Sequence, residues 1–267
     1  MVILYLHGQG GSRERSNRIA VYKSLQTTIP TAHIIALDYR GYGDSDGLPD
    51  NETLVISDAI AIWNYATQHV PASRILIYGH SLGSGIGAQL CRIVEQHGET
   101  PLGLCLEGAM ASMPQVMFEY RDQPFLKPLR PFPALVDLYS RACVFRFDTG
   151  SILPLIQCPI LLIHGREDRV IEIKFAYDMF YSLRPGHGPP TAPKHALSPL
   201  VEYAKVQAAC KSRPIWEEGR LFRWPRPDKS AQMAWFLELD YADHDSAHVY
   251  ESTQSVLGNF VAEINSS

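Results

Sequence analysis

The feature that most constrains this chain is a glycine-rich turn between an apolar run and a helical pattern. Residues 75–85 read ILIYGHSLGSG, so Gly79, Ser81 and Gly83 form a G-x-S-x-G sequence. The apolar run predicts a buried strand, and the residues after Ser81 predict a helix. A strand that passes directly into a helix bends sharply, and only glycine on both sides of the bend lets the two elements approach closely. The segment therefore predicts a strained serine whose hydroxyl points out of a sheet.

Short apolar runs and longer helical patterns alternate along the rest of the chain, which predicts an α/β fold with a mainly parallel sheet and helices on both faces. The runs are nearly continuous, as expected for strands buried on both sides. The predicted strands are Val2–Leu6, His33–Leu37, Ile75–Tyr78, Leu102–Leu106, Ile160–Ile163 and Ala234–Leu239. The predicted helices cover about 51–68, with Asn51 as the N-cap, about 82–96 and about 251–263.

Two stretches interrupt this alternation. Residues 109–155 are rich in Met, Phe, Tyr and Pro, which suits a cap inserted over a cleft. Residues 182–232 hold eight prolines between Pro185 and Pro227, which predicts an irregular surface loop followed by an isolated helix at about 200–211. We therefore predict that residues 1–267 form a single domain that carries a cap insertion and a proline-rich insertion.

The composition excludes several classes of protein. Hydrophobic residues make up 46% and charged residues 19%, which is typical of a globular chain rather than a disordered one. A net charge of -4 offers no basic surface to a nucleic acid. No apolar run approaches the roughly 20 residues that a membrane span needs, and the five widely spaced cysteines predict free thiols in a reducing compartment.

The chain opens directly in the apolar run at residues 2–6. Because a domain rarely begins inside a core strand, an N-terminal piece is expected to be missing. Association with a membrane through such a piece, or a cytoplasmic location without it, are both compatible with the sequence.

A second glycine-rich segment follows the first predicted strand. Residues 4–12 read LYLHGQGGS, and glycine-rich backbone after a strand can present N–H groups to a developing negative charge. The segment lacks the Lys-Ser/Thr ending of a phosphate-binding loop and the spacing of a dinucleotide site, so a nucleotide cofactor is not expected. The backbone N–H groups of Gln9 and Leu82 are the candidate donors of an oxyanion hole.

These two motifs, together with DYRGYGDSDG at residues 38–47, resemble the α/β-hydrolase superfamily. The resemblance is strongest to its monoacylglycerol and lysophospholipid lipases, and it covers about 1–169 and 234–261. The family pattern includes two strands ahead of the first glycine loop that this chain lacks. That difference would leave residues 33–37 at an exposed edge of the sheet.

The resemblance implies a nucleophile, an acid and a histidine in that order along the chain. Ser81 is then the nucleophile. Asp168, in the loop after the strand at 160–163, is the implied acid and is favoured over its neighbour Glu167.

The implied histidine lies in DHDSAH, between the last predicted strand and the last helix, where His248 is favoured over His244. The spacing of this pair also resembles the H-E-x-x-H zinc motif. That motif needs both histidines on one helix and a Glu as base. Here the pair is expected on a loop, with the shorter Asp and no third ligand in view, so neither a metal nor any other cofactor is predicted.

The resemblance thus implies a serine hydrolase that cleaves a carboxylic ester through an acyl-enzyme, without a cofactor. The implied substrate is a small ester or a lipid such as a monoacylglycerol or a lysophospholipid. Thioester or amide hydrolysis, and an inactive module that only binds a ligand, are the alternatives. Apolar side chains of the predicted cap could either line an acyl pocket or only pack the cap onto the sheet: Met110, Met113, Met117, Phe118, Phe125, Leu126, Leu129 and Phe132.

Overall fold

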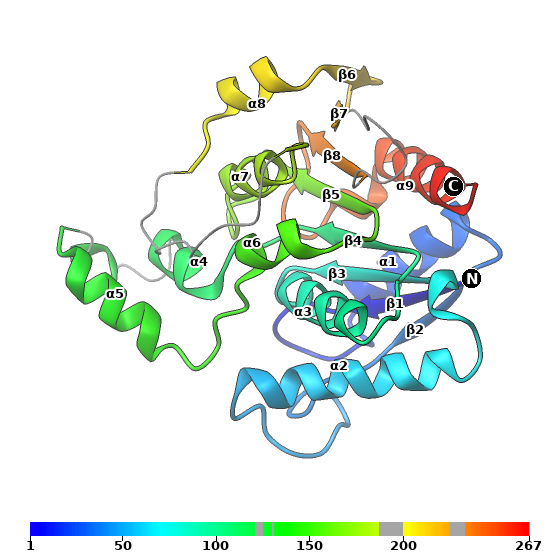
Figure 1. Ribbon diagram of the computed structural model, residues 1–267, viewed down its shortest axis with the longest axis horizontal. Helices are drawn as coiled ribbons and strands as arrows, with labels where there is room; N and C mark the ends of the chain where they lie inside the picture. Colours follow the sequence, from blue (N-terminus) through cyan, green and yellow to red (C-terminus); the bar gives the residue numbers. More distant parts are fainter. Residues whose placement is uncertain (121–124, 130, 187–199, 225–232, 267) are drawn as a thin grey trace.

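The computed structural model describes residues 1–120, 125–129, 131–186, 200–224 and 233–266. Within them the strands form one sheet in the order β2-β1-β3-β4-β5-β8-β7-β6 (Figure 1). The strands are β1 (Val2–Leu6), β2 (His33–Ala36), β3 (Ile75–His80), β4 (Gly103–Glu107), β5 (Ile160–Gly165), β6 (Ser212–Ile215), β7 (Gly219–Arg223) and β8 (Ala234–Leu239).

The six predicted strands are confirmed, and they pair in parallel from β2 through β8. Every residue of β1, β3, β4, β5 and β8 is buried. Burial on both faces explains why these segments are continuously apolar in the sequence. β2 lies at one edge, where His33 is exposed and the next three residues are half-buried, as the sequence predicted.

The other edge of the sheet differs from the prediction. β6 and β7 form an antiparallel hairpin, and β7 pairs antiparallel with β8. This hairpin lies inside the stretch predicted to hold only a loop and a helix. The helix exists as α8 (Tyr203–Ala209), shorter than expected. Residues 187–199 and 225–232 of the proline-rich stretch lie outside the described residues, so its predicted irregular first half is covered only in part.

Helices pack on both faces of the sheet (Figure 1). Alternate residues of β1 separate the two cores, with Leu4 on one side and Tyr5 on the other. The core that contains Tyr5 is closed by α1 (Ser16–Thr28) and α9 (Glu251–Asn265). The core that contains Leu4 is closed by α2 (Glu52–Thr67), α3 (Leu82–Gln96) and α7 (Lys174–Ser182).

The helix α2 begins as predicted, because the side chain of Asn51 accepts a hydrogen bond from the backbone N–H of Leu54. The helices predicted at about 51–68, 82–96 and 251–263 correspond to α2, α3 and α9, whereas α1 and α7 were not predicted. No helix in the described part of the chain is both long and apolar enough to cross a bilayer.

The described residues between 109 and 155 form short helices beside the main sheet. They are α4 (Met113–Glu119), η2 (Lys127–Leu129), α5 (Pro133–Ala142), α6 (Thr149–Ile152) and η3 (Leu153–Leu155). Figure 1 shows α5 at the periphery of the molecule, with α4 closer to the sheet. Phe118, Leu126 and Val136 form a small apolar cluster of their own within this stretch. That this stretch is a cap remains a prediction.

Candidate active site

Ser81 occupies a sharp turn between β3 and α3. Its backbone lies at φ 53° and ψ −117°, in a region that residues other than glycine rarely adopt. A Cβ atom at Gly83 would lie 1.9 Å from the carbonyl oxygen of Leu6, and one at Gly79 would lie 2.3 Å from that of Gly83. The backbone N–H of Ser81 donates to the carbonyl of Glu107 at 3.0 Å, which ties the turn to β4. Glycine on both sides is therefore required by backbone contacts.

This requirement gives a test of the turn. Gly83→Ala is expected to lower the free energy of unfolding by roughly 3 kcal/mol or more, because the added methyl group meets the backbone of the central strand β1. Gly87→Ala is the matched control, since its Cβ would meet only side chains, the nearest being Ile77 at 3.2 Å. Thermal and urea denaturation of both variants measure the difference. Equal stability of the two variants would contradict the proposed constraint.

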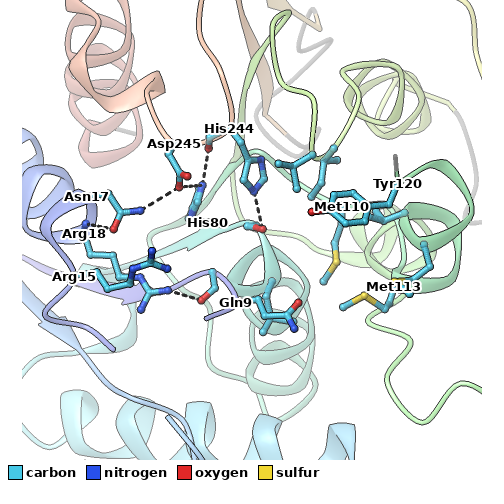
Figure 2. Close-up of a pocket in the computed structure, with 17 residues that line it drawn as sticks. Gln9, Arg15, Asn17, Arg18, His80, Met110, Met113, Tyr120, His244 and Asp245 are labelled. Atoms are coloured by element: carbon cyan, nitrogen blue, oxygen red, sulfur yellow. Dashed lines mark hydrogen bonds and ion pairs between the residues drawn. The ribbon is translucent and has the colours of Figure 1, made fainter. Parts of the chain in front are cut away.

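A histidine and a carboxylate lie in line with the Ser81 hydroxyl. His244 Nε2 lies 2.9 Å from Ser81 Oγ, the contact marked by the dashed line from the His244 ring in Figure 2. On the other side of the ring, His244 Nδ1 lies 2.7 Å from Asp168 Oδ2. The three residues follow β3, β5 and β8, which run parallel in one sheet, so their carboxyl ends share one edge. This arrangement can pass the hydroxyl proton to the imidazole while the carboxylate holds the ring.

The expectation that His248 meets the serine is corrected by this geometry. His248 lies in η4 (Ala247–Val249), is 6% exposed, and its carbonyl accepts a hydrogen bond from Ser24 Oγ of α1 at 2.7 Å. Its Nδ1 has no hydrogen-bond partner among the described residues. The loop after β8 already reaches Ser81 at His244, and the following 3-10 turn carries His248 to α1. His244, the second candidate from the sequence, therefore lies between Ser81 and Asp168, where His248 was expected.

A further histidine supports this loop. His80 Nε2 lies 2.8 Å from the backbone carbonyl of His244, and the centres of the two rings lie 5.0 Å apart. Burial lowers the pKa of His80, which favours its neutral form. The sequence does not reveal this contact, because no residue pattern marks a bond between a side chain and a distant backbone.

The Asp168 carboxylate is fixed on both of its oxygens. Oδ1 accepts hydrogen bonds from the backbone N–H groups of Val170 and Ile171, at 2.9 and 2.8 Å. Oδ2 lies 2.7 Å from His244 Nδ1 and 3.3 Å from His164 Nε2. Burial raises the pKa of Asp168, but its bonds to these two histidines outweigh burial and hold the pKa well below the ordinary value. The structure brings Asp168 to His244, whereas Glu167 is exposed.

The same carboxylate sets the proton affinity of His244. Burial lowers the pKa of His244, but the hydrogen bond and the charge of Asp168 have the larger combined effect and raise the pKa above its ordinary value of 6.5. The imidazolium form is thereby stabilised, as a group that accepts a proton during a reaction requires.

Two free backbone donors flank Ser81. In the described chain neither the N–H of Gln9 nor that of Leu82 has a protein acceptor. Leu82 is the first residue of α3, where N–H groups point out of the helix along its dipole. A Cβ atom at Gly8 would lie 3.1 Å from Ser81 Cβ, so the glycine loop is in direct contact with the serine. Gln9 and Leu82 also line the same pocket as Ser81.

The site opens into a pocket of about 530 Å³ with two unlike walls (Figure 2). Arg15, Asn17, Arg18 and Asp245 line one side. The other side carries Met110, Met113 and Tyr120, and α4 contributes two more apolar lining residues, Val116 and Met117. Val170 and Ile171 add to the apolar lining.

Of the apolar residues singled out in 109–155, Met110, Met113 and Met117 line the pocket. Phe118 and Leu126 pack in the separate apolar cluster, against which Leu129 lies. Two others are exposed, Phe125 and Phe132.

The histidine pair of the zinc-like motif is not arranged around a common point. Both ring nitrogens of His244 are engaged, one by Asp168 and one by Ser81. Among the described residues, the group of three potential metal ligands that lie close together is Cys91, Glu95 and Cys158, and none of these lines the pocket.

Comparison with known proteins agrees with this architecture. Residues 1–97 match the family model described as the alpha/beta hydrolase fold. An esterase of Pyrococcus furiosus superposes with a TM-score of 0.63 at 17% identity, over 99% of this chain and 81% of that chain. An alpha-beta hydrolase of Vibrio vulnificus superposes with a TM-score of 0.61 at 21% identity, over 99% of this chain and 73% of that chain. The chain is therefore a member of the α/β-hydrolase fold class.

Within that class the chain is related to lysophosphatidylserine lipases. It is 32% identical to Lysophosphatidylserine lipase ABHD12 of Danio rerio over 183 residues, which are 67% of this chain and 46% of the relative. It is 28% identical to Protein ABHD12B of Homo sapiens over 183 residues, which are 67% of this chain and 49% of the relative. The chain thus spans less than half the length of these curated relatives.

Proposed function

We propose that this chain is a serine hydrolase that cleaves carboxylic esters, with Ser81 as nucleophile, His244 as general base and Asp168 as the acid that orients it. The observation that carries the proposal is the continuous hydrogen-bonded arrangement from Asp168 through His244 to the Ser81 hydroxyl. It lies at the base of a pocket, where two N–H groups lack acceptors in the described chain.

Each group then has a defined role in acyl transfer. As Ser81 Oγ attacks the ester carbonyl, His244 Nε2 takes the hydroxyl proton, and ionised Asp168 stabilises the imidazolium. The N–H groups of Gln9 and Leu82 bind the oxyanion of the tetrahedral intermediate. His244 donates the proton to the departing alcohol, leaving an acyl group on Ser81. It then activates a water molecule that releases the acid.

We further propose that the substrate is a lipid ester, such as a monoacylglycerol or a lysophospholipid. The apolar wall that contains Met110, Met113 and Met117 suits an acyl chain, and the opposite wall suits a polar leaving group. The similarity to proteins named lysophosphatidylserine lipases supports a lysophospholipid.

Labelling with a fluorophosphonate probe tests this proposal, because the probe reacts only with an activated serine. The folded chain is expected to be labelled at one site, which peptide mapping locates to Ser81. Ser81→Ala is expected to abolish the labelling. Turnover of a monoacylglycerol and of a lysophospholipid with the same acyl chain then compares the leaving groups by kcat/KM. A folded chain without labelling or turnover would contradict the proposal and favour a module that only binds a ligand.

A further inference from the structure

A buried arginine holds the glycine loop beside Ser81. Arg18 is the third residue of α1 and is 3% exposed. Its Nη2 donates to the carbonyls of Gly8, at 2.7 Å, and Gly10, at 2.5 Å, and its Nη1 donates to the carbonyl of Ser12, at 2.5 Å. Figure 2 shows the Arg18 side chain on the polar side of the pocket.

The charge of this guanidinium is not balanced by a carboxylate within the described chain. The ion pairs of the neighbouring arginine Arg13 reach Asp38 and Asp44, whereas Arg18 has none. Buried charges in proteins are normally paired, because removing an ion from water is costly. Arginine keeps its proton even in such surroundings, so a positive charge remains in the wall of the site.

The conformation of the glycine loop brings the carbonyls to this charge. Gly10 and Gly11 have φ angles of +78° and +67°, in the region that glycine adopts without strain. The turn at these two residues directs the carbonyls of Gly8, Gly10 and Ser12 toward the same guanidinium. The planar guanidinium holds its N–H donors at fixed angles, so it can bind all three carbonyls at once. The ammonium group of a lysine could not reach the three carbonyls in the same geometry.

One of these contacts fixes a proposed oxyanion donor. The carbonyl of Gly8 and the N–H of Gln9 belong to the same peptide unit, and all described peptide bonds are trans. The two groups therefore point in opposite directions. Arg18 Nη2 and His7 Nδ1, at 2.7 and 2.8 Å, hold the Gly8 carbonyl on one side. The Gln9 N–H must then face away from both, and it has no acceptor in the described chain.

We infer that Arg18 is a positioning residue for the oxyanion site, a role that rests on the proposed hydrolase function. Arg18 holds the Gly8–Gln9 peptide with its N–H directed at the place where the oxyanion forms. The cation on the Gly8 carbonyl also polarises that peptide, which strengthens its N–H as a donor. Because Arg18 is buried, water screens its unbalanced charge only weakly, and this charge attracts the negative charge that develops in the tetrahedral intermediate.

The test is kinetic. Arg18→Met is expected to lower kcat for a short neutral ester by roughly 10²- to 10³-fold, the loss seen when an oxyanion donor is removed. KM should stay within about threefold, because the ground-state carbonyl carries no full charge. Arg18→Lys keeps the positive charge but loses the planar set of N–H donors, and its kcat should fall about tenfold. Arg74→Met, at an exposed arginine outside the pocket, is the matched control and should retain parental kinetics.

Rescue separates positioning from general support of the fold. In Arg18→Ala, added guanidinium or methylguanidinium at millimolar concentration is expected to restore part of kcat, and the same salt should not raise kcat of Arg74→Met. A folded Arg18→Met with parental kcat, or with a raised KM and unchanged kcat, would overturn the inference. If Arg18→Met does not fold, Arg18→Lys provides the test: a lowered kcat supports the inference, and a parental kcat overturns it. Failure of the parent to show turnover that depends on Ser81 would instead refute the proposed function itself.

Discussion

Replacing His244 with alanine is expected to lower kcat/KM for an ester by about 10⁴-fold or more, whereas His248→Ala should lower it by less than about tenfold. The reason is geometric, because His244 Nε2 lies 2.9 Å from Ser81 Oγ and is in line with Asp168. His248 makes no such contact: the residue is buried, and its backbone carbonyl accepts a hydrogen bond from Ser24 of α1. Turnover of a soluble ester, measured for both variants and the parent, gives the comparison.

Fluorophosphonate labelling adds a second measurement to this comparison. The His244 variant should react with the probe far more slowly than the parent, since the serine has lost its base, and the His248 variant should react at a similar rate to the parent. Both variants need the same thermal denaturation profile as the parent at the assay temperature. A His248 variant that loses activity while the His244 variant keeps it would refute our assignment of the base.

The choice between these histidines shows what the sequence could not supply. The two residues are four positions apart on one connection between a strand and a helix, so chain order fits either of them. What separates them is tertiary, because His80 binds the backbone of His244 and Ser24 binds that of His248. Neither contact leaves a pattern in the sequence.

The sheet was predictable wherever burial on two faces dictated the composition. The five parallel strands that are buried throughout appear as apolar runs, the edge strand β2 also has a short one, and the turn at Ser81 has the glycines that backbone contacts require. The hairpin of β6 and β7 escaped prediction because it forms an edge. β6 contains Pro214 and exposes two of its four residues, so its composition is that of a loop.

The helix α1 escaped prediction for a different reason. Its buried residues are Val21, Leu25 and the charged Arg18, so the inward face lacks the apolar periodicity that marks a helix. The same arginine is the one that binds the glycine loop. A departure from the packing pattern thus coincides with the residue that we assign to the site.

Replacing Asp168 with asparagine is expected to lower kcat by about 10⁴-fold, because the ring of His244 loses the carboxylate that orients it and stabilises its cation. Glu167→Gln is the matched control at the neighbouring, exposed acid and should change kcat by less than about threefold. Steady-state kinetics with a soluble ester at saturating concentration measure both. An Asp168→Asn variant with near-parental kcat would refute the role of this carboxylate.

The pH dependence of kcat/KM gives the same substitution a second, independent outcome. Only neutral His244 can accept the Ser81 proton, so activity of the parent should fall as pH falls through the pKa of His244, which lies above the ordinary 6.5. Without the Asp168 charge the imidazolium is less stable and its pKa drops. The ascending limb should therefore move to lower pH in Asp168→Asn, while Glu167→Gln keeps the parental limb. A limb that stays in place or moves to higher pH would show that Asp168 does not control the proton affinity of the base.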